Sequence, residues 1–291
     1  MNNISELKQH LRAVEQTRQI TNAMYLLSTA RMKQAMQNIE YNLTYLQRLR
    51  STMKDIISKT RRSAIHDHFI DLKPDGRPLF LVITADKGMC GGYNSSIVNL
   101  AIERMKAAEN PLLYSFGTVG SQMLEGRGFH PDYTAIDVLQ HPSFHMARET
   151  EELITGLYNG PDVSEIYIVY TEYVNSAVQK AVCRRLLPLL YEDFEDVEQE
   201  YDYTAEMLYE PSVEEVFDKA VPQYIIGLMY DVFMQSAASE NAARMTAMQN
   251  ATKNADEMIE HLQKDINAQR QLAITNEITE IAAATEISGA V

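Results

Sequence analysis

Hydrophobic residues recur every three or four positions through the first sixty residues of the chain. The pattern runs from Ile4 to Ile56 with only short irregularities. This spacing places one apolar stripe along a helix. Neither glycine nor proline occurs between Met1 and Lys73, so no common helix breaker interrupts the stretch. The sequence therefore predicts a first segment, residues 1–62, that forms one long helix.

The last third of the chain has a stricter pattern, in which apolar and small residues alternate steps of three and four. Its members are Met245, Met248, Thr252, Ala255, Ile259, Leu262 and Ile266. Such alternation is typical of a coiled-coil seam. The small residues Thr252 and Ala255 indicate a close approach of the partner helix. We expect residues 211–291 to form a second long helix, with Pro222 breaking or restarting it near its beginning.

Between these segments the pattern changes to short apolar runs. Leu79–Thr84 and Leu112–Phe116 are continuous runs, and Glu165–Thr171 alternates; helical stretches such as Ser95–Ala108 separate them. Strands that alternate with helices indicate an α/β layer with a mainly parallel sheet. The predicted middle domain covers residues 63–210 and ends in an acidic, tyrosine-rich connection over 192–210, with at most one edge strand.

The two terminal helices must return past each other, so we expect them to pair antiparallel. We assume that both helices leave the middle domain at the same level, near Ile57 and Pro211. Met24 and Arg244 then lie the same number of residues along their helices from that level and should be neighbours. The same count leaves residues 268–291 as a single helix that projects roughly 36 Å beyond its partner. The predicted fold class is α/β, with a long antiparallel coiled coil added to the middle domain.

Charge is distributed unevenly along the chain. The net charge is −14, which disfavours nucleic acid as a general partner. Residues 1–62 nevertheless carry 11 basic and 4 acidic side chains, whereas residues 191–220 carry 12 acidic and 1 basic. The basic end suits an acidic partner. We expect neither a secretory signal nor a membrane span, and two cysteines favour a reducing compartment.

A glycine-rich loop, Asp86–Asn94, follows the first predicted strand and precedes a helix. It lacks the Gly-Lys-Ser/Thr ending of a Walker loop and the GxGxxG spacing of dinucleotide sites. We therefore interpret it as a tight strand-to-helix turn in which Asn94 or Ser95 caps the helix, with nucleotide binding as the minor alternative. Cys90 lacks a neighbouring base, which favours a buried, inert thiol.

Histidines and carboxylates do not form a recognisable metal or catalytic set. Pro142 lies between His141 and His145, and no further ligand completes a zinc signature. The acidic run Glu192–Asp202 lacks the spacing of an EF-hand and is interpreted as a solvated segment. The sequence predicts no cofactor, no metal and no catalytic residue.

Several blocks of the sequence resemble the gamma subunit of F-type ATP synthases, in family order and over nearly the whole chain. They are Gln16–Met36, Asp86–Asn94, Glu210–Val216, Ser239–Ala255 and Arg270–Ile281. The resemblance implies an antiparallel coiled coil, a Rossmann-like α/β middle domain and a lone C-terminal helix. These features agree with the fold predicted from the hydrophobic pattern.

The resemblance also implies a function and a set of partners. The family's gamma subunit is a non-catalytic central shaft inside a ring of alpha and beta subunits. Its foot binds the epsilon subunit and the membrane rotor ring (c-ring), and ion flow turns it so that ATP is made or hydrolysed at beta. We expect a peripheral protein at the cytoplasmic face of a bacterial cell membrane.

The matched blocks imply a set of subunit-interface residues. Met24 and Arg244 correspond to positions that face an acidic lever of beta, and Arg31 and Lys33 are further cations of the first block. The resemblance places the C-terminal helix, called the upper helix below, inside the ring of alpha and beta subunits. The remaining interface residues lie on this upper helix and in the glycine loop. They are Arg270, Gln271, Thr275, Glu277 and Glu280 on the helix, and Gly88, Cys90, Gly91, Gly92 and Asn94 in the loop.

Some positions depart from the family pattern. Lysine or arginine is common in the family where this chain has Glu15, Gln19, Asn22 and Gln34, and Ala268 replaces an arginine. Fewer cations weaken attraction to an acidic partner, by about 1 kcal/mol or less for each exposed pair. Two alternatives follow: a paralogue that serves a variant F1-like motor, or a coiled-coil adaptor without rotary coupling. A nucleotide-dependent enzyme is the least favoured hypothesis.

Overall fold

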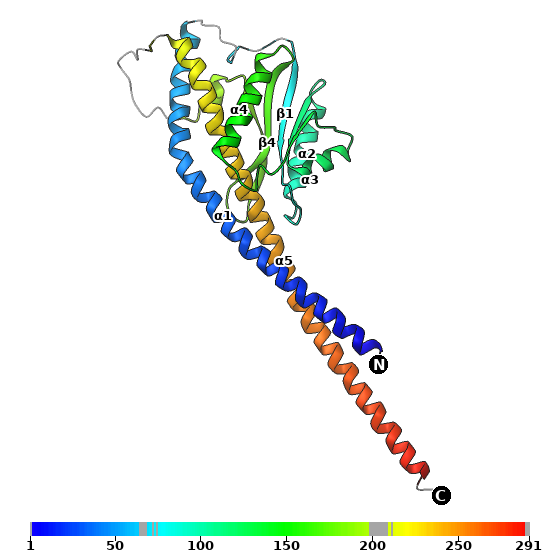
Figure 1. Ribbon diagram of the computed structural model, residues 1–291. Helices are drawn as coiled ribbons and strands as arrows, with labels where there is room; N and C mark the ends of the chain where they lie inside the picture. The colour runs from blue at the N-terminus through cyan, green and yellow to red at the C-terminus, as the bar shows by residue number, and fades with distance from the viewer. Residues whose placement is uncertain are drawn as a thin grey trace. The chain divides into compact units, whose positions relative to one another are not determined.

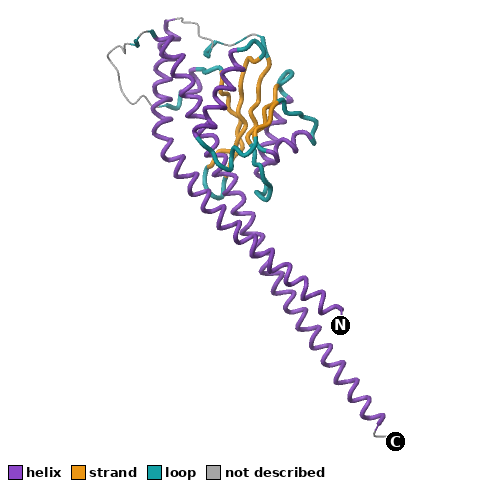
Figure 2. The backbone as a smooth tube through the Cα atoms, viewed as in Figure 1, coloured by secondary structure: helices purple, strands orange, loops and turns teal. Residues whose placement is uncertain are grey.

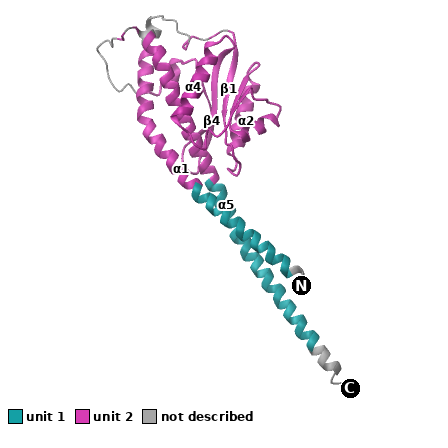
Figure 3. Ribbon diagram, in the orientation of Figure 1, with its two compact units in different colours: residues 1–27, 245–291 teal, residues 28–244 magenta. Residues whose placement is uncertain are grey.

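The computed structural model describes residues 2–63, 69–71, 73, 75–197, 209–210 and 212–288. The chain divides into two compact units, shown in Figure 3. Unit 1 contains residues 1–27 and 245–291, and unit 2 contains residues 28–244. Two long helices, α1 (Asn2–Ser63) and α5 (Val213–Ser288), contribute to both units.

Unit 2 is built around a five-stranded sheet with the strand order β3-β2-β1-β4-β5. The strands are β1 (Arg77–Ile83), β2 (Leu112–Phe116), β3 (Tyr133–Ala135), β4 (Val163–Tyr173) and β5 (Gln179–Leu187). The first four are parallel, and β5 is antiparallel to β4. The prediction of an α/β layer with a mainly parallel sheet is confirmed.

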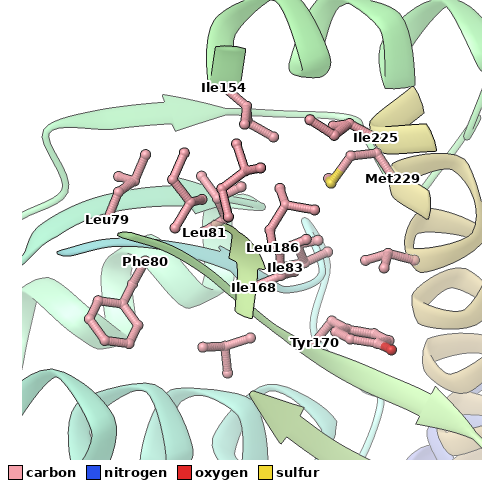
Figure 4. Close-up of a cluster of buried hydrophobic side chains, with 14 of the residues drawn as sticks. Leu79, Phe80, Leu81, Ile83, Ile154, Ile168, Tyr170, Leu186, Ile225 and Met229 are labelled. Carbon is pink, nitrogen blue, oxygen red and sulfur yellow. The ribbon is translucent and has the colours of Figure 1, made fainter. Parts of the chain in front are cut away.

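Helices cover both faces of this sheet. In Figures 1 and 2, α2 (Tyr93–Lys106) and α3 (Thr118–Glu125) lie on one face, and α4 (Phe144–Asn159) lies on the other. Side chains that alternate along a strand point to opposite faces. Accordingly, Leu81 faces Ile154 of α4 and Ile225 of α5, while Phe80 points away from them (Figure 4). Each large side chain buried in this core contributes roughly 1.5–3 kcal/mol to folding.

Pro222 lies inside α5, so the expectation that it breaks or restarts the helix is wrong. A proline in a helix interior removes one backbone hydrogen bond and costs about 3 kcal/mol. The adjacent Val221, Tyr224 and Ile225 are buried in the unit 2 core. Their burial offsets the lost bond and keeps the helix continuous.

Within unit 2, α1 packs against α5. Ala35 contacts Ala237 and Ala238, and the Asn42 side-chain amide donates to the carbonyl oxygen of Gly227 at 3.3 Å. These partners follow each other in opposite chain directions. The two helices are therefore antiparallel in this unit, as predicted.

Unit 1 is a second stretch of antiparallel helix pair. Val14 packs with Ala255 and Leu262, and the hydroxyl oxygens of Thr21 and Thr252 lie 2.8 Å apart. The predicted seam is confirmed, because all seven of its residues are buried or half-buried. The register differs from the residue count, which placed Thr21 level with position 247. The count assumed that both helices leave the middle domain at one level, whereas the contact with Thr252 lies five residues further along α5.

No second helix packs against the described end of α5. Every residue from Arg270 to Ile281 is exposed, including the large apolar side chains of Leu272, Ile274, Ile278 and Ile281. The prediction that the C-terminal helix continues as a single helix past its pairing region is confirmed for these residues.

Candidate subunit-interface site

The glycine loop of unit 2 joins the end of β1 to the start of α2. Met89 and Gly91 adopt left-handed backbone angles, with φ of +60° and +57°, so the chain turns sharply between strand and helix. The tight turn is confirmed. The predicted cap is wrong, because Gly92 occupies the N-cap position and no side chain bonds there.

Asn94 has a different task from the one predicted. Its side-chain oxygen accepts a hydrogen bond from the Ala85 backbone N–H at 2.9 Å, and its amide donates to the Cys90 sulfur at 3.3 Å. The helix starts at Tyr93, so Asn94 already lies in its first turn and reaches back to the base of the loop. Asn94 thus ties both ends of the loop together.

Cys90 is buried, with 2% of its surface exposed. Burial raises the pKa of its thiol, and the nearby positive charge of Arg244 only partly opposes this effect. A thiol with a raised pKa holds less of the reactive thiolate at neutral pH. The geometry therefore fits the interpretation of Cys90 as an inert thiol.

Arg244 of α5 clamps this loop from the helix side. Its Nη2 atom donates to Glu240 Oε1 at 2.6 Å and to the carbonyl oxygens of Lys87 and Gly88 at 3.2 and 3.3 Å. Both charged residues are buried, with 8% of Arg244 and 5% of Glu240 exposed. Burial raises the pKa of Glu240, while the charge of Arg244 acts in the opposite direction.

A short run of buried polar groups on α5 supports the same junction. The Tyr93 hydroxyl donates to the Ser236 carbonyl oxygen at 3.3 Å, and the Ser239 hydroxyl donates to the Thr171 carbonyl oxygen at 3.3 Å. Burial raises the pKa of Tyr93 well above its usual value. Sequence reasoning did not single out Glu240, Ser236, Ser239 or Tyr93. On α5, polar residues lie three and four positions apart among alanines, and this spacing is the sequence signal that could have indicated them.

A groove with a volume of about 340 Å³ lies in the same unit. Arg31 and Asn38 of α1, Gln140 and His141 of the loop before α4, and Asn241 of α5 contribute to its lining. Lys33 is exposed and does not line it. Of the expected interface residues, the structure brings Gly88, Cys90, Asn94 and Arg244 together and places Arg31 in this groove.

The remaining expected interface residues lie in unit 1. Met24 is half-buried, so its side chain is partly accessible. The five residues of the upper helix are all exposed, and the Thr275 hydroxyl donates to the Gln271 carbonyl oxygen of its own helix at 2.9 Å. The register of unit 1 places Met24 level with about position 249, three residues on from the Thr21–Thr252 contact, and not level with position 244 as the count did. Met24 and Arg244 belong to different units, so a contact between them stays a prediction.

The described part of the acidic segment is not simply solvated. Arg50 of α1 donates two hydrogen bonds to the Asp196 carboxylate, at 3.0 and 2.7 Å, and Arg185 lies 3.0 Å from Asp193. The intervening short helix η1 (Tyr191–Phe194) buries Phe194 completely. The expectation of a solvated run therefore holds for Glu192, Glu195 and Asp196, which are exposed, and is wrong for the half-buried Asp193 and the buried Phe194. Basic groups of α1 and β5 supply charges that these carboxylates can pair with, and the Phe194 ring anchors the segment. Residues 198–202 of the run lie outside the described residues.

Over the described part of the chain, no group of three or more histidine, cysteine or acidic side chains is arranged to hold a metal ion. His145 lies 3.7 Å from Glu149, one helical turn away. None of the described helices combines the length and the apolarity that crossing a membrane requires.

Comparisons with known proteins place the chain in a well-populated family. The family model described as "ATP synthase" matches residues 3–287. The ATP synthase gamma chain of Ruminiclostridium cellulolyticum is 38% identical over 289 residues, covering 96% of this chain and 97% of that protein. The sodium ion specific ATP synthase gamma chain of Acetobacterium woodii is 30% identical over 298 residues, covering 98% of each chain.

Solved structures agree at the level of the fold. A chain from the Euglena gracilis mitochondrial ATP synthase, in a structure of OSCP, F1 and c-ring, matches with a TM-score of 0.66 and 18% identity. The match covers 99% of this chain and 95% of that one. A chain from the Tetrahymena thermophila mitochondrial ATP synthase central stalk and c-ring matches with a TM-score of 0.60 and 23% identity, over 80% and 99% of the two chains.

Proposed function

Because this chain belongs to the ATP synthase gamma-chain family, we propose that it is the rotating central shaft of an F1Fo ATP synthase. The observation that carries the proposal is the match of residues 3–287 to the family model, together with relatives named gamma chain that share nearly the whole length. The chain couples ion translocation through a membrane rotor to ATP synthesis or hydrolysis at alpha and beta subunits.

The helix pairs suit the transmission of rotation. In unit 1, the buried seam fixes the two helices against each other, and in unit 2 the same two helices pack into the core of the sheet domain. A shaft selects among conformations of a surrounding ring only through contacts that differ between those conformations. The exposed apolar residues of the upper helix offer such contacts.

The proposed partners are the alpha and beta subunits around the upper helix, and the epsilon subunit and the c-ring at the foot. The proposed interface with the ring consists of these residues: Met24, Arg31, Lys33, Arg244 and the glycine loop, together with Arg270, Gln271, Thr275, Glu277 and Glu280. The chain is peripheral, at the cytoplasmic face of a bacterial cell membrane. The presence of c-rings in the Euglena and Tetrahymena structures supports the c-ring as one of these partners.

The subunit acts without chemistry of its own in this proposal. A nucleotide phosphate at the glycine loop would need free cationic or N–H donors. Arg244, which reaches the loop from α5, is bound to Glu240 and to loop carbonyl oxygens, and Lys87 of the loop donates to Gln140 Oε1 at 3.0 Å. This arrangement disfavours the nucleotide-enzyme hypothesis, and catalysis belongs to the alpha and beta subunits.

Co-expression with alpha and beta subunits of the same source tests the function. We expect a stable complex whose ATPase activity depends on this chain. The matched control is a chain that ends at Gln269, which lacks the exposed upper helix and retains the seam. Full ATPase activity of alpha and beta alone, or no complex with the intact chain, would contradict the proposal.

A further inference from the structure

We propose that the groove between α1, α5 and the loop before α4 binds a small organic anion, a carboxylate or a phosphate ester that also carries hydroxyl groups. The inference goes beyond the proposed function and does not rest on it. The groove lies wholly within unit 2. We call it the amide groove, because four of its lining residues have amide side chains: Gln34, Asn38, Gln140 and Asn241.

The amide groove has the size and the composition of a small-molecule site. Its volume of about 340 Å³ falls at the lower end of the range for ligand pockets, about 300–1,000 Å³. Ligand pockets typically combine an apolar lining with a few convergent polar groups. Here the apolar lining consists of buried side chains: Ala35, Leu139, Met234 and Ala237. A ligand that fits is therefore small and has both apolar and polar parts.

The charge of the amide groove selects an anion. Arg31 is its permanent cation and His141 becomes a second when protonated, whereas none of the described residues that line it is acidic. The whole chain has a net charge of −14, so this lining differs from the rest of the molecule. An arginine guanidinium presents a planar set of donors that matches a carboxylate or a phosphate. Arg31 therefore provides the anchor for the anionic group.

The Arg31 guanidinium is available for such a group. Toward the described residues it donates no hydrogen bond and forms no ion pair. Its charge acts on Glu240, but that carboxylate already accepts a hydrogen bond from Arg244 at 2.6 Å. Arg31 is half-buried, so a bond to it would be partly shielded from water and stronger than one at an exposed site.

Two of the four amides are held in place by the protein. Asn241 is 5% exposed, and its Nδ2 atom donates to the Ala237 carbonyl oxygen at 2.8 Å. The Gln140 side chain accepts from Lys87 Nζ at 3.0 Å and donates to Asp137. An amide side chain both donates and accepts, so the remaining amide groups of the lining can bond to ligand hydroxyls. Polar groups that are fixed beforehand lower the entropic cost of binding.

A side chain of a partner subunit is the alternative occupant, since Arg31 also belongs to the proposed interface with the ring. A groove that serves only a partner side chain should hold a free anion no better than any exposed arginine does. Binding of a small anion to the isolated full-length chain therefore separates the two occupants.

The first test measures binding of sn-glycerol 3-phosphate to the full-length chain by titration calorimetry, with ionic strength held constant by sodium chloride. We expect one site with a dissociation constant of about 1 mM or lower. Glycerate tests a carboxylate with the same kind of hydroxyl groups, and the tighter of the two ligands identifies the anionic group. Inorganic phosphate should bind at least roughly threefold more weakly than the tighter ligand, because it gives the amides no hydroxyl groups. No binding of either organic anion would overturn the proposal, and so would equal binding of inorganic phosphate or of neutral glycerol.

The second test locates the site with variants that make the same charge change inside and outside the groove. Arg31→Gln should weaken binding by at least about tenfold, because it removes a charge-assisted pair. The matched control is Arg48→Gln, which replaces an exposed arginine of the same helix that does not line the groove. It should leave binding unchanged.

A second pair of variants adds a carboxylate instead of removing a cation. Gln34→Glu should weaken binding by at least about tenfold, because the new charge repels the ligand and pairs with Arg31 three residues away. Gln37→Glu, at an exposed position outside the groove, should leave binding unchanged. Gln34 is exposed, so this pair provides the measurement if Arg31→Gln does not fold.

Equal effects of the two members of a pair would overturn the proposal, since binding would then follow the overall charge of the chain. None of these results bears on the proposed function, which fails only if the unmodified chain gives no chain-dependent ATPase activity with alpha and beta.

Discussion

Asp231 is a buried carboxyl group on α5, with 7% of the residue exposed. Burial raises its pKa, while a hydrogen bond from Gln235 Nε2 at 2.6 Å and the charge of Arg184 oppose the shift; nearby Glu172 adds to it. A carboxyl whose pKa is higher in the folded chain favours the protonated state. The folded state therefore loses stability as pH rises above the ordinary aspartate value of about 4.

Asp231→Asn should remove this penalty. At pH 7 the variant should be more stable than the unmodified chain, by on the order of 1 kcal/mol, and the difference should shrink toward pH 4. Urea unfolding at the two pH values measures it. Glu260→Gln is the control, since Lys264 lowers the pKa of that exposed carboxyl and no gain is expected. A gain from Asp231→Asn that is the same at both pH values would contradict the explanation.

At the residue scale, the sequence identified part of the site. The glycine loop and Arg244 were grouped by resemblance, and the structure brings them into contact. Glu240, Tyr93 and Ser236 were not predicted. Whether a polar residue on a long helix is buried depends on which other segment covers its face. That information comes from the tertiary packing and not from the helix's own pattern.

At the scale of single elements, alanine substitutions at two helical glycines should change stability in opposite directions. A methyl group added to Gly120 in α3 would collide with the Thr84 side chain, whereas one added to Gly156 in α4 would meet open space. Gly120→Ala should destabilise the chain by about 1–3 kcal/mol. Gly156→Ala should stabilise it by up to about 1 kcal/mol, because alanine is the better helix former. Thermal unfolding of both variants tests this, and shifts of the same sign would be inconsistent with the packing described.

The seam of unit 1 predicts a second pair of variants. Ala255 is buried in one cluster with Val14 of α1, so Ala255→Leu should force the helices apart and destabilise the pairing by about 1–3 kcal/mol. Ala268→Leu makes the same change at an exposed position and should leave the unfolding midpoint nearly unchanged. The loss of helical circular dichroism on heating provides the measurement. Equal behaviour of the two variants would mean that Ala255 is not a close-contact position.

At the element scale, helices and strands with strong hydrophobic periodicity were predicted correctly. A strand rich in polar residues and a very short strand were missed. The two long helices and strands β1, β2 and β4 followed from the hydrophobic pattern. Strand β5 was missed because Lys180, Arg184 and Arg185 interrupt its apolar positions on the sheet edge. Strand β3 has only three residues, too few for any pattern. The helix register depended on where each helix leaves the sheet domain, which residue counting cannot supply.

Removal of the upper helix tests the whole molecule. A chain that ends at Gln269 should keep the unfolding midpoint of the intact chain, because the described residues beyond it bury nothing in the subunit. Its complex with alpha and beta should lose most chain-dependent ATPase activity, since the exposed apolar residues lose their place in the ring. A lower midpoint together with full activity would contradict both expectations.

At the scale of the whole molecule, the charged segments also have surroundings that differ from those expected from the sequence. The basic first segment was expected to suit an acidic partner, and the acidic segment after residue 190 was expected to be solvated. Arg50 and Lys54 of the first segment instead bond to Asp196 and to the Val197 carbonyl oxygen. Part of each charge excess is thus neutralised within the subunit.

The single-helix stretch from Arg270 to Ile281 has a consequence for solution measurements. Its backbone amides have only their own helix to shield them, while those near Val14 and Ala255 are shielded by a partner helix. Deuterium from heavy water should therefore enter the stretch much faster than the paired region. Enclosure by a ring of subunits should slow that uptake, so hydrogen exchange would record assembly at these residues without a label or a mutation.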